Sequence, residues 1–147
     1  MQTSKRSGTQ SAANSTSRPP EPLVLFVDES LDSLTVVDAL RAAGATVERL
    51  TDHFPKGTPD ETWLAYAGGR GWVVLTRDKR IRYRQLERLA LTEAKARAFV
   101  FTGGNVTGKD TAAILVHALP RITTICQADK GPFIYHIGRG GNPIRMD

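Results

Sequence analysis

Apolar residues along the chain form short continuous runs, separated by segments in which they recur every three or four positions. Continuous runs of β-favouring residues predict buried strands, and the helical spacing between them predicts helices. The predicted strands are residues 23–27, 46–50, 72–76, 98–102 and 133–137. The predicted helices are residues 34–43, 58–67, 92–97 and 107–119, with Thr92 as an N-cap and Pro120 as the break that ends the last helix.

Strands that alternate with helices through most of the chain predict an open, mostly parallel sheet with helices on both faces. The strand at residues 72–76 is apolar from Trp72 to Leu75 and is therefore expected at the centre of the sheet. Residues 133–137 and a final segment near Ile144 are expected to form an edge hairpin, joined by a turn at residues 138–141. The sequence thus predicts an α/β fold of three layers, α/β/α, with a central mostly parallel sheet and a C-terminal edge hairpin.

Composition divides the 147 residues into two parts. Residues 1–22 are rich in Ser, Thr, Gln, Asn and Pro and hold no apolar residue that could anchor a core, so we expect a disordered N-terminal tail. Residues 23–147 are expected to form one domain. The single cysteine, Cys126, cannot form an internal disulfide and favours a reducing compartment. No apolar run approaches the roughly 20 residues that cross a bilayer and no secretory signal is present, so we expect a cytoplasmic protein without membrane contact.

The excess positive charge of the chain lies in one segment. Residues 77–97 contain eight basic and three acidic residues, a net charge of +5, which equals the net charge of the whole chain. Arg80, Arg82 and Arg84 alternate along this segment, which suits a phosphate backbone, and Tyr83 is available to stack on a base. A solvated helix face with basic residues that serve solubility is the alternative interpretation.

Acidic residues follow or precede three of the predicted elements. Asp28 and Glu29 follow the first strand, Asp60 and Glu61 open a helix, and Asp78 follows the third strand. Connecting loops at the carboxyl ends of parallel strands form a crevice, so these acids are expected to meet there. Clustered carboxylates repel one another unless a divalent cation lies between them, which points to Mg²⁺ or Mn²⁺. Each acid alone also has a structural explanation as a helix cap, a partner of a helix dipole or a turn residue; the three positions together favour a metal site.

Three segments resemble the short PIN-like nuclease domains, particularly those grouped with VapC-type toxins: residues 26–30, 52–63 and 71–82. The resemblance covers most of residues 23–137. It implies a PIN-like fold and a Mg²⁺- or Mn²⁺-dependent endoribonuclease whose products carry 5′-phosphate and 3′-hydroxyl ends. It also implies the toxin half of a toxin–antitoxin pair, with RNA and a cognate antitoxin protein as partners, and it leaves a homodimer open.

The same resemblance implies roles for individual residues. The catalytic set is Asp28, Glu29, Asp60, Glu61, Asp78 and Lys79. The three aspartates are the metal ligands, one of the two glutamates orients the attacking water, and the lysine stabilises charge on the scissile phosphate. The residues expected to contact RNA are Arg77, Lys79, Arg80, Arg82, Tyr83 and Arg84. Relatives often carry a second acid where this chain has Arg80, so one ligand is either absent or supplied by a glutamate.

Other functions are also compatible with parts of the sequence. A catalytically inactive PIN-like module that binds RNA or a protein would use the same residues. A phosphoacceptor receiver domain would use the acidic pair after the first strand together with Asp78, Thr102 and Lys109. The sequence of residues 103–110 is close to a phosphate-binding loop motif, but Asp110 occupies the position where that motif has a Ser or Thr hydroxyl to bind Mg²⁺. His53, in the loop before Asp60, is a candidate for substrate contact, and none of the three histidines has metal-ligand spacing.

Overall fold

Six strands form one sheet in the order β2-β1-β3-β4-β5-β6 in the computed structural model, which describes residues 23–78 and 91–146. The strands are β1 (Val24–Val27), β2 (Thr46–Arg49), β3 (Val73–Thr76), β4 (Arg97–Phe101), β5 (Phe133–Ile137) and β6 (Pro143–Arg145). The first five are mutually parallel, and β6 pairs antiparallel with β5. The mostly parallel sheet, the inner position of β3 and the C-terminal edge hairpin confirm the predicted fold class.

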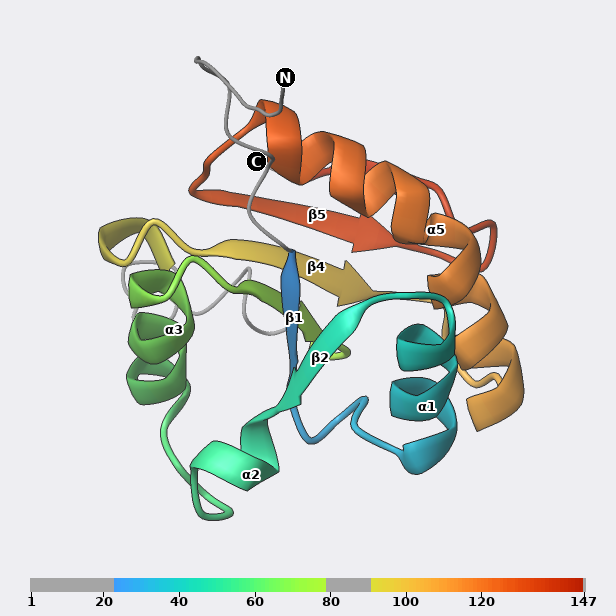
Figure 1. The fold of residues 1–147 in the computed structure, drawn as a ribbon, viewed down its shortest axis with the longest axis horizontal. Coiled ribbons are helices and arrows are strands. Elements are labelled where there is room, and N and C mark those ends of the chain that lie inside the picture. Colours follow the sequence, from blue (N-terminus) through green and yellow to red (C-terminus); the bar gives the residue numbers. More distant parts are fainter. Residues whose placement is uncertain (1–22, 79–90, 147) are drawn as a thin grey trace, which may run out of the picture.

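Helices cover both faces of this sheet (Figure 1). The helices are α1 (Leu34–Ala42), α2 (Leu50–His53), α3 (Asp60–Gly69) and α5 (Gly108–Ala128). Helices α1 and α5 pack on one face, and α2 and α3 contribute to the core on the other face. The fold therefore has the three predicted layers. Within the described residues, no helix is long and apolar enough to span a membrane.

Both faces of the inner strands are buried, which explains why their sequences are continuously apolar. In β1, Leu25 and Val27 point into the core under α1 and α5, whereas Phe26 points into the core under α2 and α3. The same alternation recurs in β3, where Leu75 faces the first core and Val74 the second. This packing places the carboxyl ends of β1 and β3 side by side.

The helix predicted for residues 92–97 with an N-cap at Thr92 is wrong. Residues 91–93 are helical, and Arg97 already belongs to β4, where it pairs with Val73 of β3. The guanidinium of Arg97 also donates to the Gly71 carbonyl at 2.8 Å. The pairing of β4 with its neighbouring strands outweighs the local helix propensity at the end of the predicted helix.

The predicted break at Pro120 is also wrong, because α5 continues to Ala128. Proline removes one helical hydrogen bond and costs about 3 kcal/mol in a helix interior. Beyond it, Ile122 and Cys126 continue the buried face of the helix, and each buried apolar side chain contributes about 1.5–3 kcal/mol. The packing gain exceeds the cost of the proline.

One further difference lies at the end of a strand. Leu50 was expected to end a strand and instead opens the short helix α2, which the sequence did not predict. The tail expected at residues 1–22 lies outside the described residues, so the division into a tail and a domain stays a prediction.

Candidate active site

Asp28 and Thr76 are buried neighbours at the carboxyl ends of β1 and β3. Val27 pairs with Leu75, and the Asp28 backbone N–H extends this ladder by donating to the Leu75 carbonyl at 3.1 Å. Asp28 is 6% exposed and Thr76 is fully buried. The first and third strands thus bring an aspartate and a hydroxyl together, as the parallel topology requires.

The Asp28 carboxylate accepts hydrogen bonds on both oxygens. Oδ1 accepts from the Ser30 backbone N–H at 2.9 Å and from the Ser30 hydroxyl, and Oδ2 accepts from the Thr76 hydroxyl. Burial raises the pKa of Asp28 above its ordinary value, these hydrogen bonds lower it, and the negative charge of Asp78 raises it further. Burial is the largest of these effects, so the hydrogen bonds to Asp28 only partly offset the cost of burying its ionised carboxylate.

The same two hydroxyls tie the end of β3 to the loop after β1. The Ser30 hydroxyl accepts from the Arg77 backbone N–H at 2.9 Å, and the Thr76 hydroxyl accepts from the Asp78 backbone N–H at 3.0 Å. Each hydroxyl therefore orients Asp28 and at the same time fixes the backbone that carries a neighbouring charged residue.

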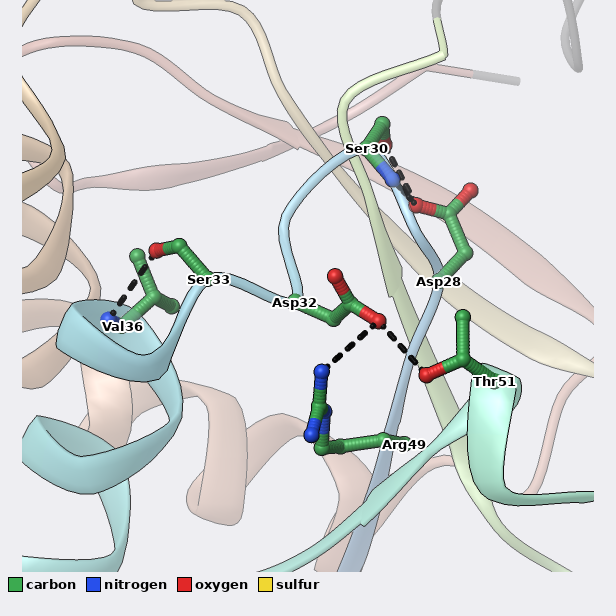
Figure 2. Close-up of polar contacts among 7 residues, drawn as sticks. All are labelled: Asp28, Ser30, Asp32, Ser33, Val36, Arg49 and Thr51. Carbon is green, nitrogen blue, oxygen red and sulfur yellow. Dashed lines mark hydrogen bonds and ion pairs between the residues drawn. The ribbon is translucent and has the colours of Figure 1, made fainter.

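The loop between β1 and α1 is fixed at its other end by a separate set of contacts (Figure 2). The Asp32 carboxylate turns toward β2 and α2, where it accepts from Thr51 Oγ1 at 2.9 Å and pairs with Arg49 Nη2 at 3.5 Å. Ser33 caps α1 by accepting from the Val36 N–H at 3.3 Å. Ser33, rather than Asp28, is thus the helix cap, and the explanation of Asp28 as a cap does not hold.

A pocket of about 430 Å³ lies over these strand ends. Its lining consists of Asp28, Glu29, Ser30, Leu50, Thr58, Asp60, Trp63, Arg77 and Asp78. One pocket therefore contains four of the five predicted acids. It also contains Arg77, which was predicted to contact RNA. The fifth acid, Glu61, is not part of this lining.

Asp60 also has a structural role at the start of α3. It is the first residue of that helix, where the helix dipole favours a carboxylate, and its Oδ1 accepts from Trp63 Nε1 at 3.1 Å. The indole contact holds the carboxylate at the pocket wall. Helix stabilisation and a place in the pocket are compatible for this residue.

The donor set of the pocket fits a hydrated divalent cation. In residues 23–78 and 91–146, no three His, Cys, Asp or Glu side chains lie close enough together to hold a metal jointly, so the three aspartates do not form a shared ligand cage. Asp28 and Asp78, however, interact electrostatically, and the carboxylate and hydroxyl side chains of the lining offer oxygen ligands. Mg²⁺ retains several waters and is commonly bound through only one or two carboxylates. The two carboxylates of Asp28 and Asp78 therefore fit this mode of binding, and Asp60 lines the same pocket.

Several predicted site residues lie outside the described residues: Lys79, Arg80, Arg82, Tyr83 and Arg84. Their contacts with RNA stay predictions from the sequence.

Three hydroxyl residues of the site were not predicted: Ser30, Thr76 and Thr58. The first two organise the Asp28 carboxylate, and the third lines the pocket. The signal that could have identified them is a small hydroxyl residue within two positions of a predicted site acid.

Residues considered for other sites lie elsewhere. His53 contacts the Tyr66 hydroxyl at 3.0 Å and Glu48 Oε1 at 2.7 Å, and it is not part of the pocket lining. Thr102, which a receiver domain would place beside its acceptor aspartate, contacts the Ile137 carbonyl at 3.5 Å and does not line the pocket either.

Comparison with known proteins places the chain beside one family. A family model described as a PIN-like domain matches residues 23–103, which include β1 to β4 and every acid of the pocket. A protein named "Putative ribonuclease VapC45" from Mycobacterium tuberculosis (strain ATCC 25618 / H37Rv) is 28% identical over 117 residues, which cover 77% of this chain and 84% of that protein. No solved structure matches the chain.

Proposed function

The chain belongs to the PIN-like domain family, and from this premise we propose that it is a metal-dependent endoribonuclease and the toxin of a VapC-type toxin–antitoxin pair. The observation that carries the proposal is the buried Asp28 carboxyl beside Asp78, in an acidic pocket that also presents Arg77. Such a pocket binds a divalent cation through its acids and a phosphodiester through the arginine.

Each pocket residue has a role in this proposal. Asp28 and Asp78 would hold Mg²⁺ or Mn²⁺, and Asp60 would assist through water. When bound, such a cation would lower the pKa of a water molecule and neutralise charge on the phosphoryl oxygens. Glu29, which is exposed at the pocket rim, orients the attacking water, and Arg77 binds a phosphate oxygen. Glu61 lies outside the lining, so Glu29 is the preferred glutamate for this role.

Ser30 and Thr76 hold the Asp28 carboxylate in one orientation. Three donors on the two carboxylate oxygens fix its plane before any ligand arrives. This preorganisation lowers the cost of arranging the metal ligand during binding. Lys79, predicted to stabilise the scissile phosphate, lies directly after Asp78 in the chain and outside the described residues.

The proposed reaction is hydrolysis of an RNA phosphodiester. The oxygen of a water molecule forms a bond with phosphorus, the bond between phosphorus and O3′ breaks, and the O3′ leaving group takes up a proton. The products are a 5′-phosphate on one fragment and a 3′-hydroxyl on the other. Attack by the neighbouring 2′-hydroxyl would instead leave a 2′,3′-cyclic phosphate, so the product ends distinguish the two chemistries.

The partners follow from the same proposal. RNA is the substrate, and an antitoxin protein that inhibits the nuclease is the protein partner, in the cytoplasm. The name of the mycobacterial relative, "Putative ribonuclease VapC45", supports RNA as the substrate. The family match also counts against the receiver and phosphate-loop alternatives, because it covers all acids of the pocket.

Cleavage of end-labelled RNA by the purified full chain tests the proposal. We expect cleavage with Mn²⁺ or Mg²⁺, none with EDTA, and a loss of at least about 100-fold for Asp28→Asn and Asp78→Asn. Asp38→Asn is the charge-matched control, because Asp38 is exposed on α1 away from the pocket. Activity that survives EDTA or either pocket substitution overturns the proposal. Binding of RNA without cleavage identifies an inactive RNA-binding module instead, and stable labelling of Asp78 by acetyl phosphate identifies a receiver.

A further inference from the structure

The side chain of Arg77 reaches from the end of β3 to the first turn of α5. Its Nη2 donates to Thr111 Oγ1 at 3.1 Å, and its guanidinium carbon lies 5.3 Å from the centre of the Phe101 ring. Arg77 also lines the pocket that contains Asp28 and Asp78. A residue of the second half of the chain, beyond the segment that matches the family, thus holds an arginine of the candidate active site.

The Thr111 hydroxyl is placed to accept from the guanidinium. Thr111 is fully buried, and its hydroxyl proton is donated to the Thr107 carbonyl at 2.9 Å, which leaves the oxygen lone pairs for Arg77. The Thr111 backbone N–H donates to the same Thr107 carbonyl at 2.9 Å. The helix therefore does not depend on the hydroxyl for its hydrogen bonding, and the contact with Arg77 is the interaction that only the hydroxyl supplies.

The guanidinium is not fully satisfied by these contacts. Among the described residues, Thr111 is its hydrogen-bond acceptor, and the Arg77 Nε is buried without a hydrogen-bond partner. A planar guanidinium with remaining N–H donors binds phosphate oxygens well, often in pairs. The Thr111 hydroxyl and the Phe101 ring restrict the rotation of the Arg77 side chain. The other N–H groups of its guanidinium therefore keep a fixed orientation.

We propose that Thr111 is a positioning residue that holds the Arg77 guanidinium at the acidic pocket, where Arg77 binds a phosphodiester of the RNA. This inference rests on the proposed nuclease function and adds a determinant on α5 to it. Without the Thr111 acceptor, Arg77 keeps its charge but samples other rotamers, and the phosphodiester is bound less often in the reactive position.

Another threonine of α5 offers a matched control. The Thr123 hydroxyl donates to the Leu119 carbonyl at 3.0 Å, the same bond to the fourth residue before it that Thr111 makes. Thr123 does not line the acidic pocket. Replacing each threonine by valine removes the same kind of helix contact, but only Thr111→Val removes an acceptor from Arg77.

The test combines four variants of the full chain: Thr111→Val, Thr111→Ser, Thr123→Val and Arg77→Met. Two readouts are measured for each, kcat/KM for cleavage of labelled RNA with Mn²⁺ and the Kd for the same RNA in EDTA by fluorescence anisotropy. Thermal melting confirms that each variant is folded. We expect Thr111→Val to lower kcat/KM about tenfold and to weaken RNA binding. The loss of a hydrogen bond to a charged group changes a rate or binding constant by about tenfold or more. Thr111→Ser and Thr123→Val stay within about twofold of the unchanged protein.

The double variant Arg77→Met/Thr111→Val separates positioning from a general structural role. If Thr111 acts through Arg77, Thr111→Val has no further effect on kcat/KM or on the RNA Kd once Arg77 is replaced. An equal loss from Thr111→Val in both backgrounds overturns the inference, and so does a Thr111→Val variant that behaves like Thr123→Val. Wild-type protein that binds RNA but does not cleave it contradicts the proposed function, while the Kd cycle still decides the inference. Wild-type protein that neither binds nor cleaves RNA overturns both.

Discussion

Thr76→Val removes the hydroxyl that connects the two halves of the candidate metal site while it keeps the size of the side chain. The hydroxyl donates to Asp28 Oδ2 and accepts from the Asp78 N–H at 3.0 Å, and the residue is fully buried. Valine removes the hydroxyl that donates to Oδ2, and it removes the side-chain acceptor of the Asp78 backbone N–H.

The size of the effect follows from these two hydrogen bonds. A bond to a charged group contributes about 1.5–3 kcal/mol and a neutral bond about 0.5–1.5 kcal/mol. The free energy of unfolding should therefore fall by about 2–4 kcal/mol. For a domain of this size, that corresponds to a decrease in Tm of about 8–15 °C. Loss of the donor also raises the pKa of Asp28 further, so metal binding and RNA cleavage decrease together with stability.

Circular dichroism melts in EDTA and RNA cleavage with Mn²⁺ measure both effects. Thr76→Ser is the matched control, since it restores the hydroxyl and removes only a methyl group, and it should recover most of the Tm and the activity. A Thr76→Val variant that melts within about 2 °C of the unchanged protein and cleaves RNA equally well would refute the reasoning that this hydroxyl organises the two aspartates.

Three further outcomes test other parts of the structure. Gly68→Ala places a Cβ 2.6 Å from the Ala94 carbonyl oxygen and should lower the free energy of unfolding by about 1–3 kcal/mol, whereas Gly69→Ala meets nothing within 4 Å and should raise it by up to about 1 kcal/mol; urea denaturation measures both. Burial raises the pKa of the Cys126 thiol from 9.0 to about 11, so the folded state keeps this proton longer than the unfolded state and stability falls as pH rises from about 9 to 11. Between pH 8 and pH 10, Cys126→Ala should lose about 1.4 kcal/mol less stability than the unchanged protein, and an equal loss in both would contradict the assignment. Asp32→Asn weakens the contacts with Arg49 that fix the loop after β1 and should lower the Tm by a few degrees, roughly the effect of 1 kcal/mol; an unchanged Tm would show that the loop is held by other contacts.

The parts of the site that sequence could predict are those fixed by local pattern and by the geometry of parallel sheets. Asp28 and Asp78 were predicted together because each follows an apolar strand, and parallel strands end at the same edge. The hydroxyls around them were not predicted, since Thr76 and Asp28 are 48 residues apart and Arg77 and Thr111 are 34 residues apart. Such pairings depend on side-chain packing that no local pattern reports.

The errors in the predicted secondary structure also arise from contacts between residues far apart in the sequence. The helix α5 passes through Pro120 because residues beyond it bury a continuous face against the sheet, a gain that local propensity does not include. Arg97 joins β4 because neighbouring strands pair with it on both sides. In both cases tertiary contacts override the preference of a short segment.

Binding of Mn²⁺ to the full chain in the absence of RNA tests most directly the central claim that Asp28 and Asp78 form a divalent metal site. Isothermal titration calorimetry should show saturable binding to the unchanged protein and to the control Asp38→Asn. For Asp28→Asn and Asp78→Asn the Kd should rise at least about tenfold, since each substitution removes one of the two charged ligands. Equal Mn²⁺ affinity in all four proteins, or no saturable binding to the unchanged protein, would contradict the account.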